Sequence, residues 1–219
     1  MNLTPPQAVL FDWDNTLVDG WAAIEAGLNA AFGTFGLPLW DRSQVLANVR
    51  RSLKESFPEI FGAEWEKARE IFYAEVRACH LQVLNPMPGA EAALKTGAGY
   101  LPMGVVSNKQ GPLLRREAAY LGWDAYFGPL IGAGDAAADK PNPAPIFMAL
   151  EALGLRPSKA IWYVGDTALD MQAARAAGVS AVLMGDAAHD GGYANIDADH
   201  MLHDCHALAM EFSSLAKQR

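Results

Sequence analysis

Short, unbroken apolar runs recur along the chain, and between them apolar residues repeat at helical spacing. The first run, Ala8–Phe11, stops at two aspartates, Asp12 and Asp14, which are one residue apart. A continuous apolar run of this length is typical of a strand buried on both faces, as in a parallel sheet. Comparable runs predict further strands at residues 103–106, 130–131, 160–164 and 179–184, and a last edge strand at 200–202.

The segment that follows the first strand has a purely helical pattern. Helices are expected at residues 21–32, from an N-cap at Asp41 through Leu53, and from about residue 64 to residue 84. Pro86, Pro88 and Gly89 then interrupt the helical spacing. We therefore expect residues 18–85 to form an all-helical cap domain that is inserted into another domain.

From Pro88 onward, strand and helix signals alternate, which is typical of a doubly wound parallel α/β sheet. Gly154 and Gly178 directly follow two of the helical segments and are expected to end them. We therefore expect residues 1–17 and 86–219 to form an α/β core domain. Its helices are expected at residues 90–96, 112–121, 143–153, 169–177 and 206–217.

The composition narrows the class of protein. The 219-residue chain is 51% hydrophobic, which is enough for one large core or a core domain with a smaller insert. Its net charge is −8 without a Lys/Arg-rich block, so we expect neither a nucleic-acid partner nor a membrane surface. Cys79 and Cys205 are the only cysteines, which favours a reducing compartment. Residues 1–7 lack a signal-peptide pattern, so we expect a cytoplasmic protein.

Polar side chains stand where three of the expected strands end. Because the carboxyl ends of parallel strands meet at a topological switch point, we expect these side chains to lie together. Carboxylates as close as those of Asp12 and Asp14 repel each other unless a cation separates them or one is protonated. The alternative is a turn in which both aspartates are solvated. The groups concerned are Asp12 and Asp14, Ser107 and Asn108, Asp166 and Thr167, and Lys140 from a proline-rich loop.

Taken in order, these groups resemble the four motifs of the haloacid dehalogenase (HAD) superfamily. The matching stretches are residues 12–16, Ser107, Lys140 and residues 165–170. The helical insert after the first motif resembles the C1-type cap of that superfamily. Residues 140–145 and 165–178 are similar to phosphoglycolate-phosphatase-like members. The resemblance implies a Rossmann-like HAD core and the activity of a phosphoric monoester hydrolase.

The resemblance also implies a role for each acidic residue. Asp12 is expected to attack phosphorus and form an aspartyl-phosphate. Asp14 is expected to be the general acid and base, which typically contributes about 10²–10⁴-fold in rate. The side chains of Asp12 and Asp166 and the backbone carbonyl of Asp14 are expected to bind Mg²⁺. Asp170 would hold a metal-bound water or orient Lys140, while the alternative for Asp166 is an N-cap.

The remaining motif residues are expected to bind the phosphoryl group. Ser107 and the backbone of Asn108 would donate hydrogen bonds to its oxygens, and Thr16 would shape the loop around it. Lys140 would neutralise the charge that these oxygens gain in the transition state. The alternatives are a strand-end cap for Ser107 and a solvated surface position for Lys140. Lys109, beside Asn108, is a further similarity to phosphoglycolate-phosphatase-like members.

The carboxylate of Asp14 favours phosphoryl transfer, because HAD dehalogenases and phosphonatases lack a carboxylate at this position. The expected substrate is a small phosphorylated metabolite such as phosphoglycolate or a sugar phosphate, and the expected protein is a monomer or homodimer. A phosphomutase of the β-phosphoglucomutase type and a non-catalytic phosphate-binding module are the alternatives. Arg50, Arg51 and Lys54 are candidates for substrate recognition, or form a solvated face. The histidines, His189 among them, lack the context of metal ligands.

Overall fold

The computed structural model describes residues 4–49, 53–192 and 196–217. The chain forms two compact units: one contains residues 1–18 and 86–219, and the other contains residues 19–85. Two short strands, β2 (Val18–Asp19) and β3 (Asn85–Pro86), pair with each other where the chain leaves and re-enters the larger unit. The insertion therefore begins and ends at one two-stranded ribbon.

The larger unit is built on a parallel sheet of six strands. These are β1 (Ala8–Phe11), β4 (Met103–Gln110), β5 (Leu130–Ala133), β6 (Ile161–Gly165), β7 (Ser180–Met184) and β8 (His200–Leu202). Their order is β5-β4-β1-β6-β7-β8. Phe11 at the end of β1 pairs with Val105 on one side and Val164 on the other. The residues after β1 therefore lie beside the carboxyl ends of both neighbouring strands.

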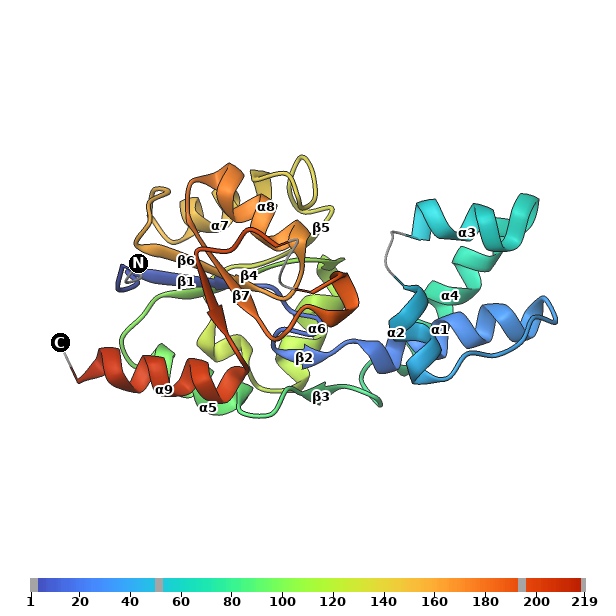
Figure 1. The fold of residues 1–219 in the computed structure, drawn as a ribbon, viewed down its shortest axis with the longest axis horizontal. Helices are drawn as coiled ribbons and strands as arrows, with labels where there is room; N and C mark the ends of the chain where they lie inside the picture. The colour runs from blue at the N-terminus through green and yellow to red at the C-terminus, as the bar shows by residue number, and fades with distance from the viewer. Residues whose placement is uncertain (1–3, 50–52, 193–195, 218–219) are drawn as a thin grey trace. The chain divides into compact units, whose positions relative to one another are not determined.

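Helices cover both faces of this sheet. They are α5 (Ala90–Ala98), α6 (Gly111–Tyr120), α7 (Ala144–Ala152), α8 (Ala168–Ala177) and α9 (Cys205–Ala216), with 3₁₀ turns η2 (Asp124–Tyr126) and η3 (Ala188–Asp190). Figure 1 shows α7 and α8 on one face and α5 and α9 on the other. Two covered faces explain why β1, β6 and β7 are buried at every residue. The predicted parallel α/β fold is confirmed.

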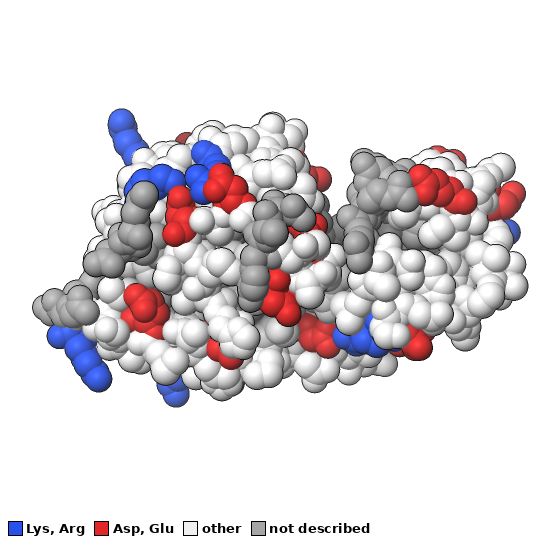
Figure 2. Space-filling view, in the orientation of Figure 1, with Lys and Arg blue, Asp and Glu red and all other residues white. Residues whose placement is uncertain are grey.

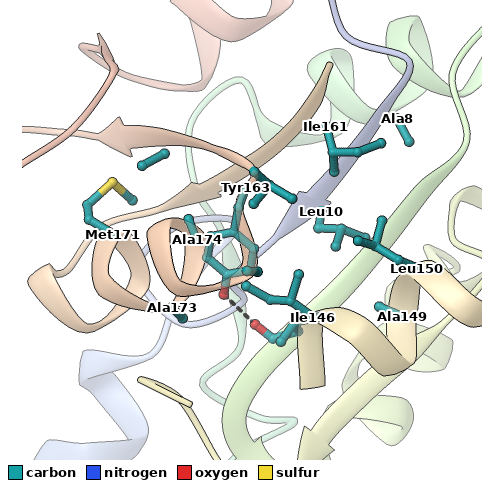
Figure 3. Packing of buried hydrophobic residues seen from close by; sticks show 14 of the residues in the cluster. Ala8, Leu10, Ile146, Ala149, Leu150, Ile161, Tyr163, Met171, Ala173 and Ala174 are labelled. Atoms are coloured by element: carbon teal, nitrogen blue, oxygen red, sulfur yellow. Dashed lines mark hydrogen bonds between the residues drawn. The ribbon is translucent and has the colours of Figure 1, made fainter. Parts of the chain in front are cut away.

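One part of the hydrophobic core lies directly beneath the carboxyl ends of β1 and β6. Leu10 and Tyr163 of these strands pack with Ile146 of α7 and with Ala174 of α8 (Figure 3). The hydroxyl of Tyr163 donates a hydrogen bond of 2.7 Å to the carbonyl of Val106, drawn as a dashed line in Figure 3. The ring of Tyr163 therefore packs in the core, while its hydroxyl lies near the carboxyl ends of the strands.

The smaller unit is helical. It contains α1 (Trp21–Thr34), α2 (Arg42–Asn48), α3 (Leu53–Phe61), a 3₁₀ turn η1 (Gly62–Glu64) and α4 (Trp65–Cys79). α1 and α4 pack closely, because a Cβ at Gly27 would come within 2.9 Å of Phe72 and Val76. The rings of Phe32, Phe57 and Phe61 contribute stacked and tilted contacts to the same core.

Two helix boundaries in this unit differ from the prediction. The helix that Asp41 caps ends at Asn48 rather than continuing to Leu53, and a separate helix, α3, follows. Pro58 lies inside α3, where its missing N–H and ring ordinarily disfavour a helix, so the pattern gave no signal for one. The last helix ends at Cys79, several residues before residue 84.

Within the part of the chain that the structure describes, none of the helices combines the length and apolar character needed to cross a membrane. On the face shown in Figure 2, acidic side chains of the described residues occur at several separate places, and so do basic ones.

Candidate active site

Asp12 lies at the carboxyl end of the central strand β1. Its backbone N–H donates to the carbonyl of Val164 at 2.8 Å, which continues the pairing of β1 with β6 by one residue. Its side chain is nearly buried, and Asp12 Oδ1 accepts a hydrogen bond of 2.6 Å from Lys140 Nζ. The structure therefore brings together the predicted nucleophile and the predicted cation from positions 128 residues apart in sequence.

Three buried acceptors surround the ammonium group of Lys140. It donates to Asp12 Oδ1 and to Asp170 Oδ1, each at 2.6 Å, and to the hydroxyl of Tyr163 at 2.8 Å. Burial works against the charge, but Asp12 and Asp170 together hold the pKa of Lys140 well above its usual value. Lys140 is therefore a fixed positive charge beside Asp12, and the alternative of a solvated surface lysine is wrong.

The side chain of Asn108 holds the loop that carries Lys140. Its Nδ2 donates to the carbonyl of Lys140 at 2.9 Å, and its Oδ1 accepts from the N–H of Lys140 at 3.0 Å. The bond from Lys140 to Pro141 is cis. The paired hydrogen bonds fix the loop against the end of β4, while the expected role of the Asn108 backbone stays a prediction.

Asp166 follows the end of β6 and is also buried. Its Oδ1 accepts a hydrogen bond of 3.1 Å from the hydroxyl of Thr16, and its Oδ2 lies 3.1 Å from His189 Nε2. Burial raises the pKa of Asp166, against the opposing effect of His189. The nearby Asp166 carboxylate in turn raises the pKa of His189. Thr16 thus orients an acidic side chain, and its contact with substrate stays a prediction.

Asp170 connects the start of α8 to Lys140. Thr167 is the N-cap of α8 and forms a capping box with Asp170, whose Oδ2 accepts from the Thr167 N–H at 3.0 Å and hydroxyl at 2.6 Å. Asp170 Oδ1 accepts from Lys140. A Cβ at Gly165 would collide with the Asp170 side chain, which explains the glycine there. The N-cap is Thr167, so the alternative that Asp166 caps this helix is wrong.

Asp12, Asp166 and Asp170 form a buried acidic cluster, in which one oxygen of each side chain lies within 4.8 Å of those of the other two. Burial raises the pKa of Asp12 to about 7, and the charges of Asp170 and Asp166 act in the same direction, against Lys140. A divalent cation bound to oxygen ligands would favour the ionised form of all three carboxylates. The cluster therefore fits a hard cation such as Mg²⁺.

Asp14 contacts a second buried group of charges. Lys109 Nζ donates to Asp14 Oδ1 at 2.7 Å and lies 2.8 Å from Glu117 Oε2. The same oxygen of Glu117 accepts a hydrogen bond of 2.7 Å from Trp13 Nε1. Burial opposes the charge of Lys109, but Asp14 and Glu117 together raise its pKa. Ser107 is buried beside this group, and its Oγ accepts from the N–H of Lys109 at 3.2 Å.

Three residues at the site escaped the sequence analysis. Tyr163 falls within an expected strand and Glu117 within an expected helix, and their spacing gives no sign of contact with Lys140 or Lys109. His189 was set aside for lack of ligand context, yet it lies against Asp166. Its position shortly after β7, another strand of the same sheet, was the available signal. Arg50 and Arg51 lie outside the described residues, and the side chain of Lys54 is not described.

Residues 9–184 match the sequence profile of the haloacid dehalogenase-like hydrolases. This match spans most of the chain and includes every motif residue described above. The chain belongs to the haloacid dehalogenase-like hydrolase family. The resemblance of residues 12–16, Ser107, Lys140 and residues 165–170 to the HAD motifs therefore led to the correct family.

Relatives and solved structures agree with this assignment. A phosphoglycolate phosphatase of Xylella fastidiosa is 32% identical over 93% of this chain and 92% of its own. Another, from Pectobacterium atrosepticum, is 34% identical over 83% of this chain and 81% of its own. A haloacid dehalogenase-like hydrolase of Streptococcus pneumoniae shares the fold, with a TM-score of 0.80 at 22% identity over 98% of this chain and 99% of its own. The prediction of a phosphoric monoester hydrolase is confirmed.

Proposed function

We propose that this HAD hydrolase is a Mg²⁺-dependent phosphatase of a small phosphomonoester and acts through an aspartyl-phosphate on Asp12. The observation that carries the proposal is the surroundings of the Asp12 carboxylate. It is nearly buried at a strand end, it accepts a hydrogen bond from Lys140, and it belongs to a cluster with Asp166 and Asp170. A carboxylate nucleophile repels an anionic phosphate group unless positive charge lies beside it, and Lys140 and a cation bound to the cluster would supply that charge.

The donors of the acidic cluster match the preference of Mg²⁺ for oxygen ligands. Asp12 and Asp166 would hold the ion through their side chains and Asp14 through its backbone carbonyl, with Asp170 and Thr16 orienting these groups. When bound, Mg²⁺ supplies positive charge that offsets the repulsion between the Asp12 carboxylate and the anionic substrate.

In the first step, a carboxylate oxygen of Asp12 attacks phosphorus and the bond from phosphorus to the ester oxygen breaks. The leaving oxygen takes a proton from Asp14, which is the general acid. Lys140 stays beside the reacting oxygens as a fixed charge, because Asp170 and Tyr163 hold its ammonium group. The product of this step is a phosphoryl group on Asp12 and a free alcohol.

In the second step, water attacks the phosphoryl group and gives its proton to Asp14, now the general base. The bond between phosphorus and the Asp12 oxygen breaks, so that inorganic phosphate leaves and the carboxylate is restored. Ser107 and the backbone of Asn108 would donate hydrogen bonds to the phosphoryl oxygens in both steps. Asn108 also fixes the loop of Lys140, so one residue serves binding and positioning.

The substrate that we propose is a small phosphorylated metabolite such as phosphoglycolate, supported by relatives with that activity over most of the chain. A sugar phosphate is the second candidate. The free thiols of Cys79 and Cys205 support a cytoplasmic enzyme. We propose that it acts as a monomer or homodimer.

The test combines two variants with a substrate panel. With Mg²⁺, the wild-type protein should release phosphate from p-nitrophenyl phosphate and, faster, from one of a panel of phosphomonoesters that includes phosphoglycolate. Asp12→Asn and Asp14→Asn should each abolish multiple turnover, since Asp12 forms the phosphorylated intermediate and Asp14 activates the water that hydrolyses it. Circular dichroism should show an intact fold in both.

Asp135→Asn is the matched control, because Asp135 pairs with Arg115 rather than with a residue of the acidic cluster. It should keep wild-type turnover. Unchanged turnover in Asp12→Asn or Asp14→Asn would refute the mechanism. Interconversion of sugar-phosphate isomers with little release of phosphate would instead indicate a phosphomutase.

A further inference from the structure

A buried ion pair holds the loop that carries Asp14. Glu117 is 0% exposed, and the side chain of Lys109 is 9% exposed. One oxygen of Glu117 accepts from Trp13 Nε1 and lies beside Lys109 Nζ, which donates to Asp14. Two successive loop residues, Trp13 and Asp14, are thus tied to one carboxylate of α6, the first directly and the second through Lys109.

Stability alone gives little reason for this arrangement. Removing a buried ion pair from water costs as much as its attraction returns, and well-packed apolar side chains in its place are often at least as stable. Trp13 already has an apolar anchor, because its ring packs edge-to-face against Trp123 and Phe127. The effect of the pair on Asp14 is a better explanation of its presence.

Asp14 is less buried than Lys109 and Glu117, so the ion pair restricts the Asp14 side chain most. Its side chain is 27% exposed, and a partly exposed carboxylate without a fixed partner samples several rotamers. The Lys109 ammonium, 2.7 Å from Asp14 Oδ1, selects one direction for this carboxylate. Glu117 cannot move with it, because Glu117 is buried in α6 and also holds Trp13.

We propose that Lys109, fixed in place by Glu117, is a positioning residue that directs the Asp14 carboxylate toward the leaving oxygen. This inference rests on the proposed function, in which Asp14 is the general acid and base. Glu117 acts through Lys109, and Lys109 acts through Asp14. The competing role for Lys109 is direct binding of the phosphoryl group.

The two roles differ in how they depend on the leaving group. p-Nitrophenolate leaves without a proton, whereas the alkoxide of an alkyl phosphate such as glycerol 2-phosphate needs one. Misdirecting the acid therefore slows release from the alkyl substrate selectively. Losing a contact to the phosphoryl group slows both substrates, because that group is the same in each.

The experiment measures release of the leaving group in a single turnover with excess enzyme, which isolates the first step. Lys109→Met should slow release from glycerol 2-phosphate by about 10²-fold or more, and release from p-nitrophenyl phosphate by less than about tenfold. Glu117→Gln keeps an oxygen that accepts from Trp13 and Lys109, so it should retain most of the rate with both substrates.

Two further variants separate positioning from folding. In Lys109→Met the carboxylate of Glu117 loses its partner, so the protein is at risk of unfolding. Lys109→Met combined with Glu117→Gln removes both charges and should show the same selective loss in a stable protein. Arg115→Met removes an ion pair to Asp135 from the same helix and should change neither rate.

An equal loss with both substrates in the double variant would overturn the inference in favour of phosphoryl binding. No loss with either substrate would overturn it as well. Asp14→Asn serves as the reference, because it should show the selective loss whatever Lys109 does. If Asp14→Asn lacks it, the proposed acid role of Asp14 fails. If Asp14→Asn has it and the double variant does not, only the positioning role fails.

Discussion

Some charged side chains at this site have several hydrogen-bond partners each. Lys140 has three buried acceptors, and Asp170 accepts from Lys140 with one oxygen and from Thr167 with the other. Asp12 is buried beside two other carboxylates and one ammonium group, and burial raises the pKa of its side chain. Its surroundings have a measurable consequence for stability.

The metal-free protein should lose stability as pH rises from about 4 to about 7. Burial raises the pKa of Asp12 from 3.8 to about 7, so in this window the folded state holds a proton that the unfolded state has released. The free energy of unfolding should therefore fall with pH, by at most about 1.4 kcal/mol per pH unit for this group. Urea unfolding in a metal chelator at several pH values measures it.

Asp12→Asn is the comparison for this experiment, since it removes the titrating group and keeps its shape. Its unfolding free energy should depend less on pH over the same window. Adding Mg²⁺ to the wild type should also flatten the dependence, because a bound cation favours the ionised cluster. Identical pH dependence in wild type and Asp12→Asn would show that Asp12 does not titrate there.

At the level of elements, the sequence predicts the ends of β1 and β6 to within one residue, because parallel strands covered on both faces leave apolar runs. The end of β4 was predicted wrongly at Val106: the strand continues to Gln110 through polar residues that carry no apolar signal.

The sequence predicts helix boundaries in the helical unit less well. Pro58 disfavours a helix in the sequence pattern, so α3 was not predicted. The apolar spacing of residues 41–53 predicted one helix where the structure has α2 and the start of α3. The capping boxes at Asp41 and Thr167 involve only local contacts, yet the sequence analysis predicted only the N-cap at Asp41 and neither box.

The two capping boxes give a prediction that separates stability from activity. Thr167→Ala should cost about 1 kcal/mol of stability, since α8 loses its N-cap. It should also lower turnover of p-nitrophenyl phosphate, because Asp170 loses the hydroxyl that holds it beside Lys140. Thr167→Ser keeps a hydroxyl and should preserve both properties. Thermal unfolding and steady-state kinetics measure the two effects.

Asp41→Ala removes the corresponding cap from α2 of the helical unit. It should lower thermal stability and leave turnover at the wild-type level. Equal losses of turnover in Asp41→Ala and Thr167→Ala would mean that activity follows helix stability in general, rather than the position of Asp170.

Across the whole molecule, the site depends on contacts between residues far apart in sequence. The order of the motifs identified Asp12, Ser107, Lys140 and Asp166. Asp12 and Asp166 directly follow strands, Ser107 lies in the second half of β4, and Lys140 lies in the loop before α7. The contacts of Glu117 with Trp13 and of Lys140 with Tyr163 were beyond reach of the sequence. These contacts depend on which helix packs over which strand, and contacts of this kind produce no periodic pattern in the sequence.

Chemical trapping of the phosphorylated enzyme tests the central claim most directly. In Asp14→Asn, p-nitrophenyl phosphate should still phosphorylate Asp12, because its leaving group needs no proton, while hydrolysis of the intermediate slows. Quenching this variant with borohydride should convert residue 12 to homoserine, detected by peptide mass spectrometry, and Asp12→Asn with Asp14→Asn should show none. Release of one equivalent of p-nitrophenolate with residue 12 unmodified, or with the modification at another residue, would contradict the account.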